Sequence, residues 1–314
     1  MPVIVVESPG LLTTVQDLGR PGYGHLGVAP AGAADPVALR VGNALVGNPP
    51  DAAALEMTLA GGRFLLPEGA AVALTGADGG PVLSGQPAPM WATVEVRPGE
   101  RLAVGAARAG ARCYLSVRGG IRVPLFLGSA STQLACGLGG FCGRRLQRGD
   151  VLEIGAAEGG YECRRLSARA LGHFAPANTL RVTAGPEWER FDAGAREAFL
   201  AQAWRVTADS DRAGLRLAGA RLETSGFERM ITEGVDLGSI QVPPSGQPII
   251  LFVEQQTTGG YPRIGVVASV DLWRVGQLRP GDEVRFSLVD LEEAVRLIRE
   301  QEQLLASEEF LFGE

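Results

Sequence analysis

Three segments of the chain combine polar side chains with glycines, and their residue types are the ones that could do chemistry. They span residues 16–35, 119–132 and 254–262. Hydroxyl, amide and backbone N–H groups can bind a carboxylate, a carbonyl or a developing oxyanion without a metal. Glycines let the backbone come close to such a ligand. The sequence therefore predicts a site for a small polar molecule at one or more of these segments.

Histidine limits the mechanisms that are open to this chain, because it contains only His25 and His173. There is no HExxH motif, no histidine pair at zinc spacing and no G-x-S-x-G elbow, so we expect no metal site. His25 lies inside the first polar segment and is the better candidate for a functional histidine. His173 lies in a stretch with little pattern, where a structural role is the simpler interpretation.

Each polar segment also has a structural interpretation. Asp17 and Arg20 have the spacing of a salt bridge that would pin the first loop. Asp35 precedes a proline and a run of apolar residues, so it can be a helix cap. The stretch TTGGYP can be a tight turn and nothing more. Residue types and spacing leave both interpretations open.

Composition excludes several classes of protein. All 29 basic residues are arginines, and a Walker A loop, a Schiff-base enzyme and a biotin carrier each need a lysine. The net charge of -6 argues against a nucleic-acid partner. No stretch approaches the roughly 20 apolar residues of a membrane span, and no basic region precedes the first apolar run. We expect a cytoplasmic protein with no membrane partner and with reduced cysteines.

The elements that must position the polar groups are mainly strands. Short β-rich runs broken by glycine and proline occur in both halves, such as AAVALTGA, ARCYLSVRGG and VLEIG in the first and SIQVP, QPIILFVE and DEVRFSLV in the second. This texture is typical of barrels and sandwiches. The polar, glycine-rich stretches 8–36 and 127–150 are expected to be loops that are longer than simple connections.

Helices are few. A first helix should begin after its cap Asp35 and continue through an apolar run to residue 46. Residues 186–204 should be helical with a break at Gly194. The clearest helical pattern starts at Asp290, where the acidic residues have capping-box spacing.

The second half repeats features of the first half. LRPGDEVRF echoes VRPGERLAV, and DSDRAG echoes QDLGR. The repetition predicts two similar β domains in one chain. The expected limits are residues 1–175 for the first barrel domain, 176–289 for the second barrel domain and 290–314 for a C-terminal helix and tail.

Several long blocks resemble the family of the 5-oxoprolinase C subunit, which is also called urea amidolyase-related or biotin-dependent carboxyltransferase-like. The resemblance runs in order from about Thr13 to Phe286 and covers nearly the whole chain. It implies two cyclophilin-like β-barrel domains with a few helices. The blocks are QDLGRPGYGHLGVAPAGAADPVALRVGNALVGN, ALEMTLAGG, VALTGAD, YLSVRGGIRVPLFLGSASTQL, DRAGLRLAG, EGVDLGSIQVPPSGQPIILF, QTTGGYPRIGVVASVDL and QLRPGDEVRF.

The resemblance also implies a function. The chain would be the C subunit of an ATP-dependent amide hydrolase, 5-oxoprolinase, that opens the lactam of 5-oxo-L-proline to L-glutamate together with proteins like the A and B subunits of that enzyme. It would be inactive alone, and ATP would be used by the whole complex at a site that is not known. No lysine is present to carry covalent biotin. Two alternatives stay open, namely the carboxyltransferase half of a urea-carboxylase-like enzyme and a non-enzymatic antagonist of a sporulation-kinase inhibitor.

The matched blocks carry polar positions that the resemblance marks as candidate site residues. They are Gln16, Asp17, Arg20, His25, Asp35, Asn43, Glu56, Asp78, Ser129, Thr132, Asp211, Arg212, Glu233, Gln241, Gln256, Thr257, Thr258 and Tyr261. The catalytic candidates are Asp17, His25, Gly259 and Gly260. The substrate-binding candidates are Gln16, Arg20, Asp35, Ser129, Thr132, Arg212, Glu254, Gln256, Thr257, Thr258 and Tyr261.

Roles can be suggested by residue type. Arg20 or Arg212 would pair with the substrate carboxylate, because a guanidinium binds it through two parallel hydrogen bonds. His25 or Asp17 would move protons, and backbone N–H groups of the Gly-Gly pair would hold the oxyanion. The family usually has an aspartate and then a basic or polar residue before QTTGGYP, where this chain has Glu254 and Gln255. The extra methylene could displace a substrate-binding carboxylate by about 1 Å.

Overall fold

A computed structural model describes residues 1–157, 159–175, 177–224, 226–227 and 230–313. The chain folds into two compact units. The first consists of Met1–Arg20, Ala31–Ala175 and Leu304–Glu314, and the second of Pro21–Pro30 and Pro176–Gln303. Both units are built mainly from strands, so the expected fold class is confirmed. The domain limits at residues 175 and 289 stay predictions.

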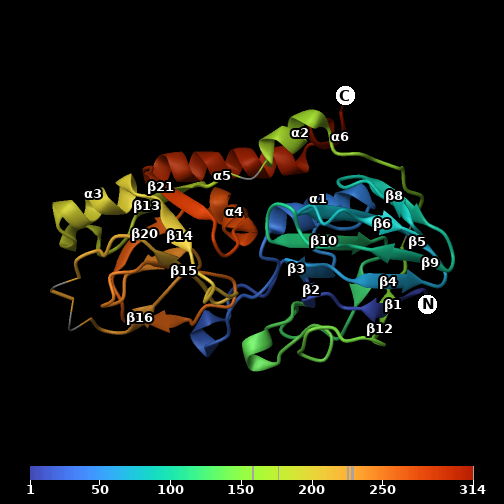
Figure 1. Cartoon of the computed structure of the whole chain (residues 1–314), viewed down its shortest axis with the longest axis horizontal. Coiled ribbons are helices and arrows are strands. Elements are labelled where there is room, and N and C mark those ends of the chain that lie inside the picture. Colours follow the sequence, from blue (N-terminus) through green and yellow to red (C-terminus); the bar gives the residue numbers. More distant parts are fainter. Residues whose placement is uncertain (158, 176, 225, 228–229, 314) are drawn as a thin grey trace. The chain divides into compact units, whose positions relative to one another are not determined.

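The first unit contains two β-sheets (Figure 1). The seven-stranded sheet has the order β11 (Ile121–Arg122), β12 (Val151–Ile154), β1 (Val3–Ser8), β4 (Arg63–Leu66), β9 (Glu100–Ala103), β6 (Val82–Leu83) and β7 (Gln86–Pro87). The five-stranded sheet has the order β2 (Leu12–Gln16), β3 (Ala54–Thr58), β10 (Arg112–Val117), β5 (Ala70–Gly76) and β8 (Thr93–Val96).

One apolar cluster drawn from both sheets forms the core of the first unit. It includes Ile4 and Phe64 from the seven-stranded sheet and Leu55, Leu74 and Leu115 from the five-stranded sheet, all 0% exposed. Strands that alternate between buried and exposed residues, such as β12, supply one face to this core. By contrast, β10 is buried along its whole length, because α1 (Pro36–Leu45) covers its second face (Figure 1).

The cap of α1 is the one expected from the sequence. Asp35 Oδ1 accepts a hydrogen bond of 2.8 Å from the Ala38 amide, and a proline occupies the first turn. Residues 8–36, however, are not a single loop, because Leu12–Gln16 forms β2. It pairs with β3 from Leu12 opposite Thr58 to Gln16 opposite Ala54. A strand partner some 40 residues away leaves no local sequence signal, and this is why the prediction missed β2.

The second unit is a closed barrel. Its strands have the order β13 (Thr179–Ala184), β20 (Arg263–Val267), β17 (Ser239–Gln241), β18 (Ile249–Leu251), β15 (Gly214–Ala218), β14 (Trp204–Val206) and β21 (Glu283–Leu288). Phe286 of β21 is buried and stacks on the buried Phe199 with ring centroids 4.5 Å apart. A two-stranded ribbon, β16 (Glu233–Gly234) with β19 (Thr258–Gly259), carries the QTTGGYP segment.

Two helices of the second unit begin at aspartate caps. Residues 186–204 form η3 (Trp188–Arg190), α3 (Ala193–Ala201) and the start of β14. The predicted break at Gly194 is wrong: α3 begins one residue earlier, because Asp192 caps it by accepting a hydrogen bond of 2.7 Å from Ala195. Asp290 caps α5 (Leu291–Ala306) in the same way, through Glu293 at 2.7 Å. Among the described residues, the first unit also contains η2 (Leu134–Cys136), α2 (Ala168–His173) and α6 (Glu308–Phe312), and the second unit contains η1 (Gly24–Leu26), η4 (Ser269–Asp271) and α4 (Leu272–Gln277).

The repeated sequence texture corresponds to a repeated turn. In the stretch 97–100 the Arg97 amide donates to Glu100 at 2.8 Å, and in 279–282 the Arg279 amide donates to Asp282 at 3.0 Å. The intervening glycines, Gly99 and Gly281, have φ of +81° and +95°. Each turn leads into a strand, β9 or β21. Both turns thus share an acidic residue three positions after the first amide and a glycine at positive φ, which are features that a short stretch of sequence can show.

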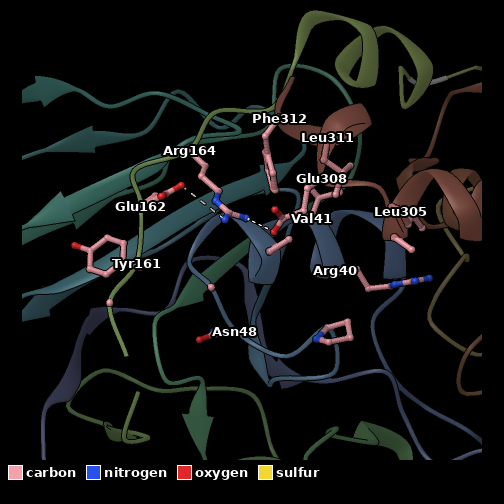
Figure 2. A pocket seen from close by; sticks show the side chains of 15 residues that line it. Arg40, Val41, Asn48, Tyr161, Glu162, Arg164, Leu305, Glu308, Leu311 and Phe312 are labelled. Atoms are coloured by element: carbon pink, nitrogen blue, oxygen red, sulfur yellow. Dashed lines mark hydrogen bonds and ion pairs between the residues drawn. The ribbon is translucent and has the colours of Figure 1, made fainter. Parts of the chain in front are cut away.

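The C-terminal segment packs on the first unit through aromatic side chains. Phe310 is 7% exposed and lies edge-on to His173 and Phe174, with ring centroids 5.6 and 6.1 Å away. Ser167 donates a hydrogen bond of 2.7 Å to the Phe310 carbonyl. Figure 2 shows the adjoining pocket of about 490 Å³, in which Arg164 reaches Glu308 at 2.8 Å. The dashed lines in Figure 2 join Arg164 to Glu162 and to Glu308. Because these charged groups pair with one another, the pocket is better explained by packing of the C-terminal segment than by ligand binding.

Truncating Phe310 is expected to destabilise the chain. The substitution Phe310→Ala removes a buried ring and leaves a cavity, which costs roughly 3 kcal/mol for a residue of this size. Glu308→Gln removes only an exposed ion pair and should cost less than about 1 kcal/mol. Denaturant unfolding of both variants checks this. Equal midpoints for wild type and Phe310→Ala would show that the segment does not stabilise the unit.

Candidate functional site

Asp17 organises the polar loops of the first unit. It follows β2 and is 8% exposed. Its Oδ1 accepts hydrogen bonds from the Gly19 amide at 2.7 Å, the Ser129 hydroxyl at 2.6 Å and the Ser131 hydroxyl at 2.5 Å. Its Oδ2 accepts one from the Ala130 amide at 2.6 Å. This Asp17 cluster (Asp17, Gly19, Ser129, Ala130 and Ser131) ties together two of the three polar segments noted in the sequence.

Arg20 lies against the same loops and is buried. Its Nε donates to the Phe126 carbonyl at 3.3 Å, its Nη2 donates to the Ser131 carbonyl, and its guanidinium lies 5.5 Å from the Phe126 ring centroid. A Cβ on Gly139 would lie 2.7 Å from Arg20 Nη2. The residue is 2% exposed, and its guanidinium binds the chain's own carbonyls. These surroundings suit a residue that holds a loop in place.

Gln16 and Thr132 continue the network under the loops. The Gln16 amide donates to the Thr132 carbonyl at 3.1 Å, and the Thr132 hydroxyl donates to the Val15 carbonyl at 3.0 Å. Both side chains are 0% exposed. Gly140 approaches so closely that a Cβ there would overlap the Thr132 hydroxyl. Among the residues that the structure describes, Gln16 Oε1 has no hydrogen-bond donor, and a buried acceptor of this kind is costly.

A second buried group, Glu56 with Tyr114, supports the start of α1. The Tyr114 hydroxyl donates to Glu56 Oε2 at 2.6 Å, and the Ala34 amide donates to the same oxygen at 2.8 Å. The Asp35 amide donates to the Tyr114 hydroxyl at 2.8 Å. Burial, and then the charges of Glu56 and Asp35, raise the pKa of Tyr114 well above its ordinary value. Asp35 is therefore placed as a helix cap inside a buried network, which is the structural interpretation of this residue.

His25 has a different environment. It belongs to the segment Pro21–Pro30 and lies on η1, where it is exposed. Its Nδ1 is 3.1 Å from the Gly22 carbonyl, and that bond leaves Nε2 as the ring nitrogen that can exchange a proton. Of the two residues suggested for proton transfer, Asp17 is buried and His25 meets bulk solvent.

In the second unit, Arg212 pairs with Glu254. Arg212 Nε lies 2.5 Å from Glu254 Oε1, and the two side chains are 6% and 4% exposed. The Glu254 amide also donates to the Arg212 carbonyl at 2.8 Å. The glutamate that departs from the family pattern is thus the partner of a buried arginine. Such a pair is costly to break, because one buried charge would lose the opposite charge of the other.

Buried amides lie beneath the glycine turn, which we define as Thr257 to Tyr261. A Cβ on Gly259 would collide with Gln241 Nε2, so this position requires glycine. Gln256 Nε2 approaches Gln241 Oε1 at 3.5 Å. Within the described chain, Gln241 Nε2 and Gln255 Oε1 are buried without a hydrogen-bond partner. Thr258 and Tyr261 are exposed beside them.

Glu187 and Arg263 hold the ribbon that carries the glycine turn, and the sequence interpretation did not identify either residue. Arg263 Nη2 lies 2.9 Å from Glu187 Oε1 and 3.1 Å from Glu233 Oε2, and its Nη1 donates to the Gly234 carbonyl at 3.3 Å. Glu233 pairs with Gly259 across the ribbon. Arg263 therefore ties the ribbon to the barrel strand β20. The opposite charges of Glu187 and Arg263 were the only sequence signal for this pair. No spacing rule connects two residues that lie 76 positions apart.

This pair predicts a pH dependence of stability. Burial raises the pKa of Glu187, but the hydrogen bonds and charge of Arg263 outweigh burial, so the pKa lies below its ordinary value. A folded-state pKa below the unfolded value of about 4.3 stabilises the protein at higher pH. This stabilisation is lost as the pH falls through the folded-state pKa. The difference in unfolding midpoint between wild type and Glu187→Gln should therefore shrink from pH 6 to pH 3. The exposed Glu197→Gln serves as the matched control, and a constant difference for Glu187→Gln would contradict the prediction.

Comparison with known proteins shows which family this chain belongs to. The family described as "Carboxyltransferase domain, subdomain A and B" matches residues 26–288. The chain belongs to this carboxyltransferase family. It is 38% identical to the C subunit of 5-oxoprolinase from Escherichia coli (strain K12), and the match covers 96% of each chain. It is 36% identical to the C subunit of 5-oxoprolinase from Haemophilus influenzae, over 92% of each chain.

A solved structure shares the fold of this carboxyltransferase-family chain. The crystal structure of the K. lactis urea amidolyase superposes with a TM-score of 0.91 at 31% identity and covers 96% of this chain. The chain spans only 20% of that much longer protein. The expected resemblance to the 5-oxoprolinase C subunit and to urea amidolyases is confirmed. None of the described helices is long and apolar enough to cross a membrane.

The carboxyltransferase-family chain thus carries two polar sites, one in each unit. The Asp17 cluster offers buried hydroxyls and amides on a rigid support, and a cavity of about 740 Å³ lies beside it, bordered by Phe126 and Gly139. The glycine turn offers exposed hydroxyls and backbone amides. Neither requires a metal, and no group of three His, Cys, Asp or Glu side chains in the described ranges could hold one. The donors of the Asp17 cluster are used by Asp17 itself, so the glycine turn is the better placed of the two to bind a small polar molecule or an oxyanion.

Proposed function

We propose that the chain is the C subunit of a cytoplasmic ATP-dependent 5-oxoprolinase, which opens the lactam of 5-oxo-L-proline to L-glutamate. Its similarity to the C subunit of the E. coli enzyme is the observation that carries the proposal, because that match covers 96% of both chains. A protein that matches a subunit over this share of both chains is expected to act in the same kind of complex. Proteins like the A and B subunits of 5-oxoprolinase would complete the enzyme, and the chain would be inactive alone.

The chemistry requires activation of a stable amide. Water supplies the oxygen of the new carboxylate, the C–N bond of the ring breaks, and the ring nitrogen becomes the amine of glutamate. ATP consumed by the complex would supply the driving force. Backbone N–H groups of Gly259 and Gly260 would hold the oxyanion, since both glycines are half-buried and carry no side chain of their own. His25, exposed and with Nε2 available, would move the proton to the leaving nitrogen.

Other candidate residues take supporting roles in this proposal. Asp17 and Arg20 would hold the loops of the first unit in position, since their polar atoms bind the chain itself. Arg212 and Glu254 would do the same in the second unit. Direct contact with substrate falls to the exposed or half-buried side chains of the glycine turn and of the residue before it, namely Gln256, Thr257, Thr258 and Tyr261.

A carboxyltransferase acting on urea or another small amide is the second candidate. The TM-score of 0.91 with the K. lactis urea amidolyase favours it. This activity would require a biotin carrier on another chain, because no lysine is present here. A carrier and carboxylase encoded beside this chain would support the second candidate over the first.

Reconstitution tests the proposal. We would co-express this chain with proteins like the A and B subunits of 5-oxoprolinase and measure ATP-dependent release of glutamate from 5-oxo-L-proline, with and without this chain. Release that requires the chain is the expected result. A well-folded complex that releases no glutamate, but transfers a carboxyl group to urea from a biotinylated carrier, would replace the first candidate with the second.

A further inference from the structure

A cavity of about 370 Å³ lies beside the glycine turn of the second unit. Its walls come from three stretches of chain that the sequence does not link. They include Arg221, Phe227, Met230, Val242, Gly260 and Tyr261. The volume lies in the range that small-molecule sites occupy. The turn proposed to hold the oxyanion thus forms one wall of this cavity.

Backbone hydrogen bonds fix the walls of this cavity. The Val242 amide donates to the Pro262 carbonyl at 2.9 Å, so the end of β17 is tied to the end of the glycine turn. The Leu222 amide donates to the Gly246 carbonyl at 3.0 Å. Gly246 has φ of +73°, and a Cβ there would collide with Arg221 Cγ. Gly246 is therefore needed for the aliphatic part of the Arg221 side chain to pack against the backbone at residue 246. This packing helps to position the Arg221 guanidinium.

Arg190 holds the part of the cavity wall that Phe227 and Met230 form. Its guanidinium stacks on Phe227 at 4.6 Å from the ring centroid, and its Nη2 donates to the Gly226 carbonyl at 3.1 Å. Its Nη1 also approaches Met230 Sδ at 3.3 Å. Phe227 and Met230 are thereby placed as an apolar side of the cavity, together with the buried Val242. An apolar wall of this kind suits the methylene groups of a small ring.

Arg221 differs from the two arginines that the sequence nominated for a carboxylate. Arg20 and Arg212 are buried, at 2% and 6% exposure, and bind carbonyl or carboxylate groups of the chain. Arg221 is exposed at the cavity, and in the part of the chain that the structure describes its side chain makes one hydrogen bond, of 3.3 Å, to the Pro244 carbonyl. Its guanidinium therefore still has donors for a ligand carboxylate.

Glu223 contributes the opposite charge to the cavity. Its Oε1 accepts a hydrogen bond of 2.9 Å from the Thr224 amide. A carboxylate is the kind of acceptor that matches an N–H group of a ligand. The pair of charges fits a molecule in which a carboxylate stands next to an N–H group. The apolar wall fits a ring, and the glycine turn fits a carbonyl.

We propose that this cavity binds the substrate, a small cyclic amide with a carboxylate, with Arg221 as the residue that pairs with the carboxylate. The proposal rests on the proposed function, because 5-oxo-L-proline has the required carboxylate, ring N–H, methylenes and carbonyl. The Phe227, Met230 and Val242 side chains face the ring, and the Gly260 end of the turn faces the lactam carbonyl. Arg221 is then a determinant of specificity for acidic lactams.

Ligand binding to the full-length chain tests the cavity directly. We would titrate wild type, Arg221→Gln and Met230→Trp with 5-oxo-L-proline and with 2-pyrrolidinone, which has the same ring but no carboxylate. Arg221→Gln should raise the Kd for 5-oxo-L-proline roughly tenfold to a hundredfold and leave the Kd for 2-pyrrolidinone unchanged. Met230→Trp fills the cavity and should weaken both ligands. Arg205→Gln, an exposed arginine of β14 outside the cavity, is the matched control and should change neither.

The reconstituted complex separates this proposal from the proposed function. If the complex releases glutamate, Arg221→Gln should raise KM at least tenfold with kcat changed by less than about threefold, since it acts in binding. Turnover with KM unaltered in both Arg221→Gln and Met230→Trp would overturn the cavity and leave the function standing. Binding that depends on Arg221 without any turnover would support the cavity and overturn the function. Neither binding nor turnover by folded wild type would overturn both.

Discussion

Asp17→Ala is expected to remove most of the activity of the reconstituted complex and to lower the free energy of unfolding by about 3–5 kcal/mol. The carboxylate accepts four hydrogen bonds, from the hydroxyls of Ser129 and Ser131 and from two backbone amides. Each buried donor left without an acceptor costs about 1–3 kcal/mol, and relaxation of the loops recovers part of the sum. Denaturant unfolding and glutamate release measure the two effects.

Two further variants show whether geometry or charge is responsible. Asp17→Asn keeps the shape but turns an NH₂ group toward one of its donors, so we expect it to lose nearly as much stability as Asp17→Ala. Asp51→Ala changes an exposed aspartate of the same unit and should alter stability by less than about 0.5 kcal/mol. An Asp17→Ala protein that unfolds and turns over like wild type would show that the cluster neither holds the loops nor serves the reaction.

Breaking the Arg212–Glu254 pair from one side is the second large effect that we expect. Arg212→Met should lower the free energy of unfolding by about 3–5 kcal/mol, because it leaves the carboxylate of Glu254 buried without this arginine. The double variant Arg212→Met with Glu254→Met should recover most of this loss, since an apolar pair of similar volume needs no desolvation of charge. Arg296→Ala breaks exposed pairs with Glu293 and Glu300 and should leave the unfolding midpoint close to that of wild type.

The same double variant decides between the two roles suggested for Arg212. A positioning role predicts that the stable double variant keeps a KM for 5-oxo-L-proline close to that of wild type. A direct contact with the substrate carboxylate predicts a KM at least tenfold higher, even though the fold is restored. A double variant as unstable as the single variant would contradict the assignment of the pair to a structural role.

Local sequence was sufficient for those features that neighbouring residues specify. The caps at Asp35 and Asp290 each use an aspartate that accepts from an amide three residues later. The turns before β9 and β21 use an acidic residue and a glycine within four positions. Strands β5 and β10 lie in the β-rich runs AAVALTGA and ARCYLSVRGG, which are bounded by glycine or proline. All of these depend on hydrogen bonds or periodicity over a few residues, which a sequence shows directly.

Pairing between distant segments was not visible in the same way. The sequence placed Leu12–Gln16 in a loop because its strand partner lies about 40 residues further on. It grouped Asp17 with Arg20, whereas the hydrogen bonds of the folded chain join Asp17 to Ser129 and Ser131. It marked Arg212 as free for a ligand, although Glu254 fills that place. Strand partners and hydrogen-bond partners that are distant in sequence compete with neighbouring residues. Which of them a residue contacts depends on the packing of the folded chain.

By itself, the sequence determined the family, the mainly β fold, the absence of lysine chemistry and the segments in which polar groups gather. The tertiary structure decided which of these groups are bound by the protein itself and which stay accessible. Arg20 and Arg212 are buried against carbonyls and a carboxylate, while Arg221 stays exposed at a cavity beside the glycine turn. The physical reason is that exposure and hydrogen-bond satisfaction are properties of the assembled fold. A residue type states what a side chain can bind, and its surroundings decide whether it is still available to do so.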